Sequence, residues 1–343
     1  MKRLFSYIFT FAAIAGALTL SSCRRTPNPA TIGELKVICD ESVENVIRQE
    51  VEVFELKYPA TKIKAQYTDK KTAIDSLLNL SVGVIVVPHE LTQDQINYLK
   101  SQKRNAFCMP VAVDAIAVIA NRQNPIEDLS MAQLSDILTG KVTDWNQISP
   151  NKTGEIDVVF DHQGSSTVEY MLKNVTEGKP FGKNIYAQKT NTEVFKAVKT
   201  HKGAIGIIGV SWLNRDLTDL AKVNNYSKEE VEKIDNASVI NHEISSSYLE
   251  NDSLSFQSDV KVVAIRKNDS PYAFKPYQQD IYTGDYPLFR TIYAICTGSN
   301  GSPQHGFYVF LSSILGQKVI LNTGVLPANM PPARSVAIQQ DEY

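Results

Sequence analysis

The sequence predicts an α/β fold made of two lobes. Short apolar runs alternate with segments whose apolar residues recur every three or four positions, and this alternation is typical of α/β proteins. A middle block with its own alternating elements is bracketed by two strand-like crossings, near Asp114 and near Tyr286. A domain inserted between the two halves of another gives two lobes that meet at a cleft, where ligands usually bind. We therefore expect lobe 1 to comprise 35–113 and 286–343, and lobe 2 to comprise 114–285.

The apolar runs predict buried strands, because most of them are apolar throughout rather than alternating with polar residues. They cover 35–39, 82–88, 111–121, 156–160, 204–210 and 286–295. A more polar and less regular region runs from about 214 to 259. The pattern becomes regular again at 286–295, which is predicted as a strand.

Helix starts are marked by hydroxyl residues that can accept a hydrogen bond from the backbone. A helix is expected from Ser42, followed by apolar residues at helical spacing. Two further helices have capping boxes, formed by Thr92 with Gln95 and by Ser130 with Gln133. Near the C-terminus, 305–327 is predicted as one long helix that stops at Gly324.

The chain begins with the pattern of a secretory leader. Lys2 and Arg3 precede an uncharged apolar stretch over 4–20, which leads into Leu20-Ser21-Ser22-Cys23. A transmembrane anchor is an alternative, but the apolar run is shorter than the roughly 20 residues that a spanning helix needs. A plain signal peptide is another alternative, in which the cysteine is incidental.

A cysteine at the cleavage site, with leucine three residues upstream, is typical of bacterial lipoproteins, in which the thiol receives a diacylglycerol. We therefore expect 1–22 to be removed, Cys23 to carry lipid and 23–34 to form a tether. The expected location is the membrane surface, facing the periplasm.

Composition excludes some functions of the remaining chain. Removal of the 22 leader residues leaves 321 of the 343, which is enough for two domains of ordinary size. The leader contains two basic residues and no acid, so the formal charge changes from −2 to −4. A mildly acidic chain without basic clusters is a poor candidate for binding nucleic acid.

The cysteines and histidines give no metal or cofactor motif. Cys39, Cys108 and Cys296 remain after Cys23, and an odd number allows at most one internal disulfide. The pair His89-Glu90 lacks the second histidine of a zinc helix, and the glycines of 203–210 do not form Gly-x-Gly-x-x-Gly. We therefore expect neither a metal nor a cofactor.

The stretch "FDHQGSSTVEY" (160–170) allows three interpretations. A strand that turns at Gly164 into Ser165, Ser166 and Thr167 at a helix start would present hydroxyls and unpaired N–H groups to an anion. Ser166 and Glu169 also have the spacing of a capping box, which would use some of these donors. A serine hydrolase is the third interpretation, but no Gly-x-Ser-x-Gly elbow is present and no histidine can be assigned as its base. We therefore expect no enzyme activity.

Five ordered motifs resemble the phosphate-binding proteins of ABC transporters. They are "DAIAVIANRQNPIEDLSMAQLSDILTGKVTDWNQI" (114–148), "GSSTVEY", "GAIGIIGVSWL", "YPLFRTIY" and a terminal segment ending "GVLPA", and they span nearly the whole mature chain. The resemblance implies a type II periplasmic binding protein fold, each lobe being a mixed sheet flanked by helices. It also implies that an inorganic phosphate or related oxyanion binds in the interlobe cleft and passes to an ABC permease in the inner membrane.

The resemblance also implies which residues bind the oxyanion. The family uses hydroxyls, helix-start amides, an arginine, and an aspartate that accepts a proton from the ligand. In this chain the first loop is "CDESV", with Ser42 and the amide of Val43 in contact positions. The second is the turn from Gly164 through Ser165, Ser166 and Thr167.

Three acidic positions depart from the family pattern. Asp161 stands where the family has its arginine, and Asp40 and Glu41 add carboxylates at the other loop. We expect Asp40 to take part in binding as a proton acceptor, and His89, near the family's charged position before the second helix, to supply a cation when protonated. A receptor for a different ligand, a sensor or a surface scaffold with this fold remain alternatives, because site residues decide function.

Overall fold

The computed structural model describes residues 29–149, 154–213, 229 and 260–329. The strands are β1 (Gly33–Asp40), β2 (Thr61–Thr68), β3 (Val84–Val87), β4 (Phe107–Asn121), β5 (Asp128–Ser130), β6 (Val158–Phe160), β7 (Ile185–Ala187), β8 (Ile205–Gly209), β9 (Val260–Arg266), β10 (Ala273–Phe274), β11 (Phe289–Cys296) and β12 (Leu326–Pro327). The α-helices are α2 (Glu44–Lys57), α3 (Lys70–Leu78), α4 (Gln93–Ser101), α5 (Met131–Leu138), α6 (Ser166–Asn174), α7 (Asn191–Thr200), α10 (Gln278–Tyr282), α11 (Pro303–Leu311) and α12 (Ile314–Asn322). Short 3-10 helices are η1 (Pro29–Thr31), η2 (Glu41–Val43), η3 (Trp145–Gln147) and η4 (Val210–Trp212).

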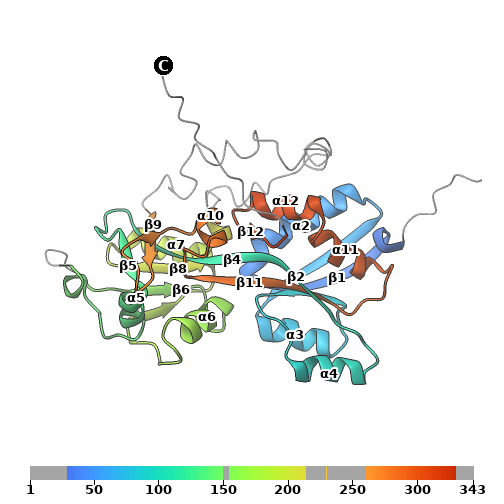
Figure 1. Ribbon diagram of the computed structural model, residues 1–343, viewed down its shortest axis with the longest axis horizontal. Helices are drawn as coiled ribbons and strands as arrows, with labels where there is room; N and C mark the ends of the chain where they lie inside the picture. Colours follow the sequence, from blue (N-terminus) through green and yellow to red (C-terminus); the bar gives the residue numbers. More distant parts are fainter. Residues whose placement is uncertain (1–28, 150–153, 214–228, 230–259, 330–343) are drawn as a thin grey trace, which may run out of the picture.

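The strands form two lobes that share a pair of long strands, which confirms the predicted two-lobed α/β fold (Figure 1). In lobe 1 the order is β2-β1-β3-β11-β4, with the first three parallel and β11 antiparallel to both neighbours. In lobe 2, β4 pairs with β8 and β9, and β6 lies between β8 and β7. The division at 113/114 and 285/286 remains a proposal about how the chain separates into lobes.

β4 and β11 run side by side from one lobe into the other (Figure 1). The first part of β4 pairs with β11, and its last part pairs with β8 and β9, so one strand belongs to both sheets. Tyr286, which precedes β11 and is fully buried, donates a hydrogen bond from its hydroxyl to the carbonyl of Ile116, 2.6 Å away. This contact fixes the chain where it passes between the lobes.

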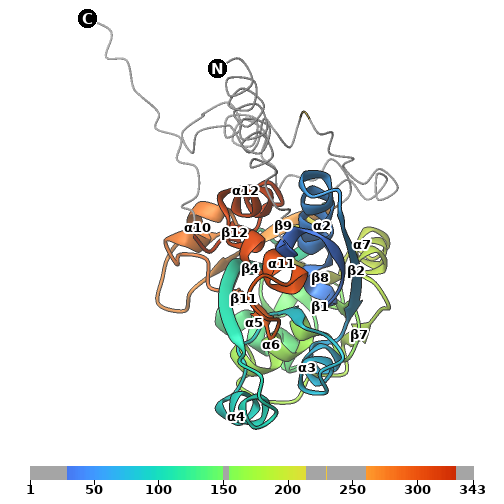
Figure 2. The ribbon, with the colours of Figure 1, turned by 90° about the vertical axis from the view of Figure 1, so that its right-hand side faces the viewer.

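The sheet of lobe 1 is covered by helices on both faces. α2, α11 and α12 lie on one side, and α3 and α4 lie on the other (Figure 2). Alternate residues of β1 serve the two cores: Val37 and Cys39 pack toward the first face, while Ile38 packs toward the second. On the first face, the Phe54 ring lies edge-on to those of Phe307 and Phe310, with centroids 5.4 and 5.0 Å apart.

Both predicted capping boxes are present. Thr92 with Gln95 starts α4, and Ser130 with Gln133 starts α5, each with the two reciprocal hydrogen bonds. These local signals require no information about the rest of the fold, and they mark both helix starts.

The predicted single helix over 305–327 is wrong. The chain turns at Ser312 and Ser313, and α12 begins anew with the Ser313 hydroxyl accepting from the N–H of Gly316, 3.1 Å away. The turn brings the backbones of the two helices together, since a Cβ on Gly316 would lie 2.3 Å from the carbonyl oxygen of Phe310. Only glycine fits at this contact. The segment after α12 pairs with β4 as β12.

Some predictions concern residues outside the described ranges. The leader, Cys23 and the first half of the predicted tether (23–28) fall within 1–28, and the polar region over 214–259 is undescribed except at Glu229. Within the described residues, no helix combines the length and the hydrophobicity needed to cross a membrane.

Candidate functional site

The candidate site lies where the carboxyl ends of two strands from different lobes meet. β1 of lobe 1 ends at Asp40 and leads through η2 into α2, while β6 of lobe 2 ends at Phe160 and leads into α6. Ligands in open α/β sheets bind outside such strand ends, where helix starts supply N–H donors. The structure therefore brings together the two loops that the sequence singled out.

Capping at α6 differs from the prediction. Ser165, not Ser166, is the N-cap: its hydroxyl accepts from the N–H of Val168 at 3.2 Å. The predicted capping box of Ser166 with Glu169 is therefore wrong, because Ser166 is already the first residue of the helix. Its hydroxyl is consequently available to the other lobe.

A cluster of hydroxyls surrounds the carboxylate of Asp40. Asp40 Oδ1 accepts from the N–H of Ser42 at 3.0 Å, from the Ser42 hydroxyl, and from the hydroxyl of Ser166 at 2.8 Å. The two serine oxygens lie 3.1 Å apart. Asp40 is 0% exposed, and both serines are buried. We call Asp40, Ser42 and Ser166 the interlobe hydroxyl cluster.

An arginine that the sequence analysis did not assign to the site joins this cluster. Arg290 of β11 donates from Nη1 to the Ser166 hydroxyl at 2.9 Å. Its Nε and Nη2 donate to Asp114 Oδ2 at 3.2 and 3.0 Å. Burial raises the pKa of Asp114, and the neighbouring guanidinium acts against that rise. Arg290 is thus a buried cation held by one carboxylate, with one N–H directed at the cluster.

Signals for this pair were present in the sequence. Asp114 and Arg290 are charged residues inside apolar strands, and both fall within the quoted motifs "DAIAV" and "YPLFR". Charged residues are rarely buried unless they are paired. The pairing itself spans 176 positions and could not be read from local spacing.

The remaining predicted site residues lie at different places. Val43 and Thr167 are buried next to the cluster residues in sequence, whereas Gly164 is exposed and its N–H donates to His162 Nδ1 at 3.2 Å. His89 is exposed after β3, and its ring contacts the Glu90 carbonyl. Among the described residues, no hydrogen bond or ion pair joins His89 to the interlobe hydroxyl cluster. The prediction that His89 supplies the cation thus has no contact to support it.

Two further contacts cross between the lobes beside the cluster. Glu41 of η2 contacts His162, and Lys70 of α3 pairs with Glu169 of α6. Burial raises the pKa of Glu41 to about 6, partly offset by His162 and reinforced by the carboxylates of Asp161, Asp40 and Asp69. These two contacts therefore add to the polar contacts by which the cluster joins the lobes.

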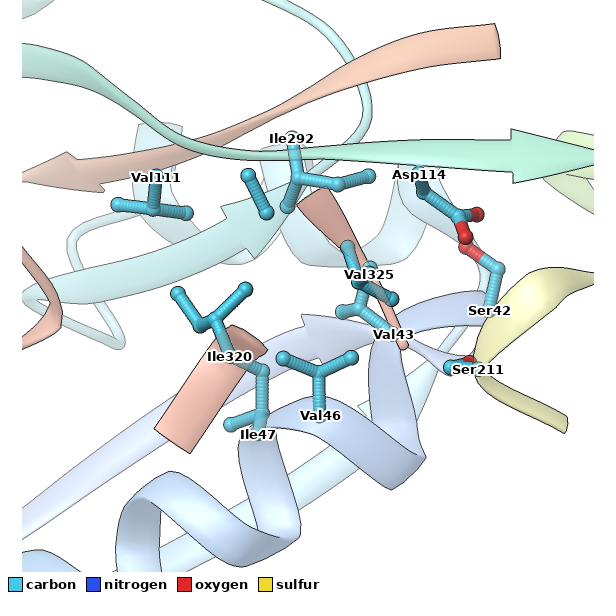
Figure 3. A pocket seen from close by; sticks show the side chains of 11 residues that line it. Ser42, Val43, Val46, Ile47, Val111, Asp114, Ser211, Ile292, Ile320 and Val325 are labelled. Atoms are coloured by element: carbon cyan, nitrogen blue, oxygen red, sulfur yellow. The ribbon is translucent and has the colours of Figure 1, made fainter. Parts of the chain in front are cut away.

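A small apolar pocket lies beside the cluster (Figure 3). Ser42, Asp114 and Ser211 line one end, and aliphatic side chains line the rest: Val43, Val46, Ile47, Val111, Ala112, Ile292, Ile320 and Val325. Its volume of about 10 Å³ is at the lower limit for one water molecule. The pocket is therefore too small and too apolar to hold an oxyanion.

The described residues do not form a nucleophilic or metal site. The Ser166 hydroxyl contacts Asp40, Ser42 and Arg290 but no histidine that could act as its base. No group of three or more His, Cys, Asp or Glu side chains that could hold a metal occurs within the described ranges. Cys39, Cys108 and Cys296 are free thiols.

The arrangement is that of a two-lobed binding protein, with polar groups from both lobes meeting at the interlobe contact. A family model described as a PBP superfamily domain matches residues 25–313, and the chain belongs to this superfamily. Its members named below are binding proteins rather than enzymes.

Several relatives and solved structures with this fold are named as phosphate-binding proteins. The phosphate-binding protein PstS of Pseudomonas aeruginosa is 19% identical over 349 residues, covering 95% of each chain. PstS 2 of Streptococcus agalactiae is 28% identical over 134 residues, which are 39% of this chain and only 44% of that protein.

Among solved structures, a putative phosphate ABC transporter substrate-binding protein with bound phosphate from Clostridium perfringens has a TM-score of 0.62 at 19% identity, covering 86% of this chain and 100% of its own. An ABC-type phosphate transport receptor from Vibrio cholerae has a TM-score of 0.58 at 17% identity, covering 86% and 99%. At these identities the likeness shows the fold.

The buried ion pair gives a first prediction. Arg290→Met leaves the Asp114 carboxylate buried without its partner, so we expect the free energy of unfolding to fall by about 3–5 kcal/mol. Adding Asp114→Asn to Arg290→Met removes the unpaired charge, and we expect it to restore part of this loss. Urea denaturation of both variants measures the two values. A double variant no more stable than the single one would contradict the pairing.

Glu41 gives a pH dependence of stability. Its folded pKa of about 6 lies above the ordinary 4.5, so the folded state holds the proton more tightly. The resulting stabilisation is complete below pH 4.5 and is lost as the pH rises through about 6. We expect the wild type to lose stability relative to Glu41→Gln over this interval, measured by thermal unfolding from pH 4 to 8. Glu127→Gln, an exposed acid paired with Lys261, is the control, and a wild-type curve parallel to that of Glu41→Gln would contradict the assignment.

Proposed function

We propose that this chain is a lipid-anchored solute receptor of an ABC-type phosphate import system, binding phosphate or a related oxyanion between its lobes. The observation that carries the proposal is the convergence of two serine hydroxyls, one from each lobe, with the guanidinium of Arg290. A guanidinium forms strong charge-assisted hydrogen bonds to an oxyanion, and each serine hydroxyl can donate one more hydrogen. The phosphate named in the relatives supports the choice of ligand.

The start of α6 adds further donors. The first N–H groups of a helix have no acceptor within the helix, and those of Ser166 and Thr167 belong to this set. The positive end of the helix dipole also favours an anion there. Ser42, Ser166, Thr167 and Arg290 are therefore the residues that we propose to contact the ligand, with Ser165 holding the helix start in place.

We propose that Arg290 supplies the positive charge that is missing at position 161, where this chain has an aspartate and the family has an arginine. Asp161 is buried, and its carboxylate accepts from the N–H of His162 at 2.9 Å, so it is held within its own loop. The guanidinium comes instead from β11, the strand that pairs with β4. A receptor for a different ligand is the alternative. Asp161 favours it, because the acid at this position leaves the cation on Arg290, at a different place relative to the helix starts.

The membrane partner and the anchor complete the proposal. The relatives' names place such receptors with ABC transporters, and we propose that a permease in the inner membrane receives the ligand. The leader pattern supports a lipid on Cys23 and a location facing the periplasm.

Phosphate binding tests the function directly. We expect isothermal titration calorimetry at neutral pH to show binding to the wild type, and Ser166→Ala to weaken it at least tenfold, because one hydroxyl donor is lost where charge-assisted hydrogen bonds are made. Ser130→Ala, which removes the cap of α5 in the same lobe, is the matched control and should bind as the wild type does. A wild type that shows no heat at millimolar phosphate would refute the function.

Lipidation is tested in cells. We expect the wild type to incorporate an alkyne fatty acid and to partition into the detergent phase, and Cys23→Ser to do neither, because the thiol is the acceptor. Cys108→Ser removes an exposed thiol elsewhere and should behave as the wild type does. Label retained on Cys23→Ser would contradict the anchor.

A further inference from the structure

The carboxylate of Asp40 lies at the centre of the donors that the proposed function assigns to a ligand. Its Oδ1 accepts from Ser42 N–H at 3.0 Å, from the Ser42 hydroxyl and from the Ser166 hydroxyl at 2.8 Å. The contact to Ser166 joins positions 126 residues apart and connects the two lobes. Its Oδ2 is buried without a hydrogen-bond partner in the described part of the chain.

Helix capping accounts for only part of this arrangement. Asp69 is a comparable cap in the same lobe: it accepts from Thr72 N–H at 2.9 Å and from the Thr72 hydroxyl at 2.6 Å, and it remains partly exposed. Asp40 makes the same local contacts with Ser42 but is fully buried and also accepts from the opposite lobe. The interlobe contact is thus a feature that a cap does not require.

Each donor hydrogen in the cluster can serve only one acceptor. Ser42 and Ser166 have one hydroxyl hydrogen each, and both hydroxyls donate this hydrogen to Asp40 Oδ1. The Ser166 oxygen also receives a hydrogen from Arg290, so the carboxylate is connected to the guanidinium through one hydroxyl. An external oxyanion at this place would need the same hydrogens and would face the Asp40 charge. The carboxylate and such an anion therefore compete.

We propose that Asp40 is an internal ligand: its carboxylate occupies the anion position between the lobes, holds them closed without solute, and must leave its donors before an external oxyanion can bind. The inference rests on the proposed function only for the chemical class of the external ligand. The closed contact itself follows from Asp40, Ser42 and Ser166.

The test compares the shape of the protein with and without the carboxylate. Small-angle X-ray scattering of the ligand-free wild type should give the compact profile of this structure, and Asp40→Ala should give a larger radius of gyration. Sodium formate supplies a carboxylate without a side chain, so we expect it to restore the compact profile of Asp40→Ala. Formate should leave the wild type unchanged, and Asp69→Ala, which removes only a cap, should behave as the wild type does.

A second variant and a binding measurement complete the test. Ser166→Ala keeps the Asp40 cap but removes its contact with the other lobe, and we expect it also to open. Calorimetry should show phosphate binding to Asp40→Ala at least tenfold more tightly than to the wild type, because the competitor is absent. Weaker binding would overturn the proposal, since Asp40 would then assist the ligand rather than replace it.

The outcomes separate this inference from the proposed function. One outcome supports the internal ligand and refutes the import function: the wild type does not bind phosphate, and Asp40→Ala is expanded but becomes compact when formate is added. A wild type that binds phosphate, with an Asp40→Ala variant that stays compact or does not respond to formate, overturns the internal ligand and leaves the import function standing.

Discussion

The buried ion pair of Asp114 and Arg290 is the interaction on which the rest of the site depends. The two residues lie opposite each other in β11 and in β4, the strand that belongs to both sheets, and both are almost completely buried. A charge in such surroundings is tolerated only with a partner and with its hydrogen bonds satisfied. Asp114 accepts from the Nε and Nη2 of the guanidinium, which fixes the plane of Arg290 and directs Nη1 toward the Ser166 hydroxyl.

Much of the fold could be predicted from local patterns, and the errors have physical causes. Apolar runs identified the central strands, and hydroxyl caps located α4 and α5. β2 was missed because alternate residues face outward at an edge of the sheet, so it contains no apolar run. The break between α11 and α12 was missed because it depends on how closely Gly316 approaches the carbonyl of Phe310, which is a tertiary contact.

The site was predicted in part for the same reason. The two loops were found because strand ends and helix starts have local signatures, which placed Asp40, Ser42 and Ser166 together. The cation was assigned to His89 instead of Arg290, because the family pattern was followed position by position along the chain. Strand pairing brings Arg290 to the cluster from a position that is distant in sequence.

The Asp114–Arg290 ion pair does not itself hold the two lobes together. Because β4 and β11 pair with each other, the Asp114–Arg290 contact does not depend on lobe position. Among the described residues, the contacts that join the lobes at the site are those of Ser166, the Glu41–His162 contact and the Lys70–Glu169 pair, and a hydrogen bond from Asn45 to the Ser211 carbonyl lies nearby. Hydrogen bonds of this kind contribute about 1 kcal/mol each, and partly exposed ion pairs contribute about 0–1 kcal/mol. Their sum of a few kcal/mol is within the range that a ligand can shift by binding one state more tightly than the other. The closed state is therefore weak enough to be governed by whichever anion, internal or external, accepts the hydrogens of Ser42 and Ser166.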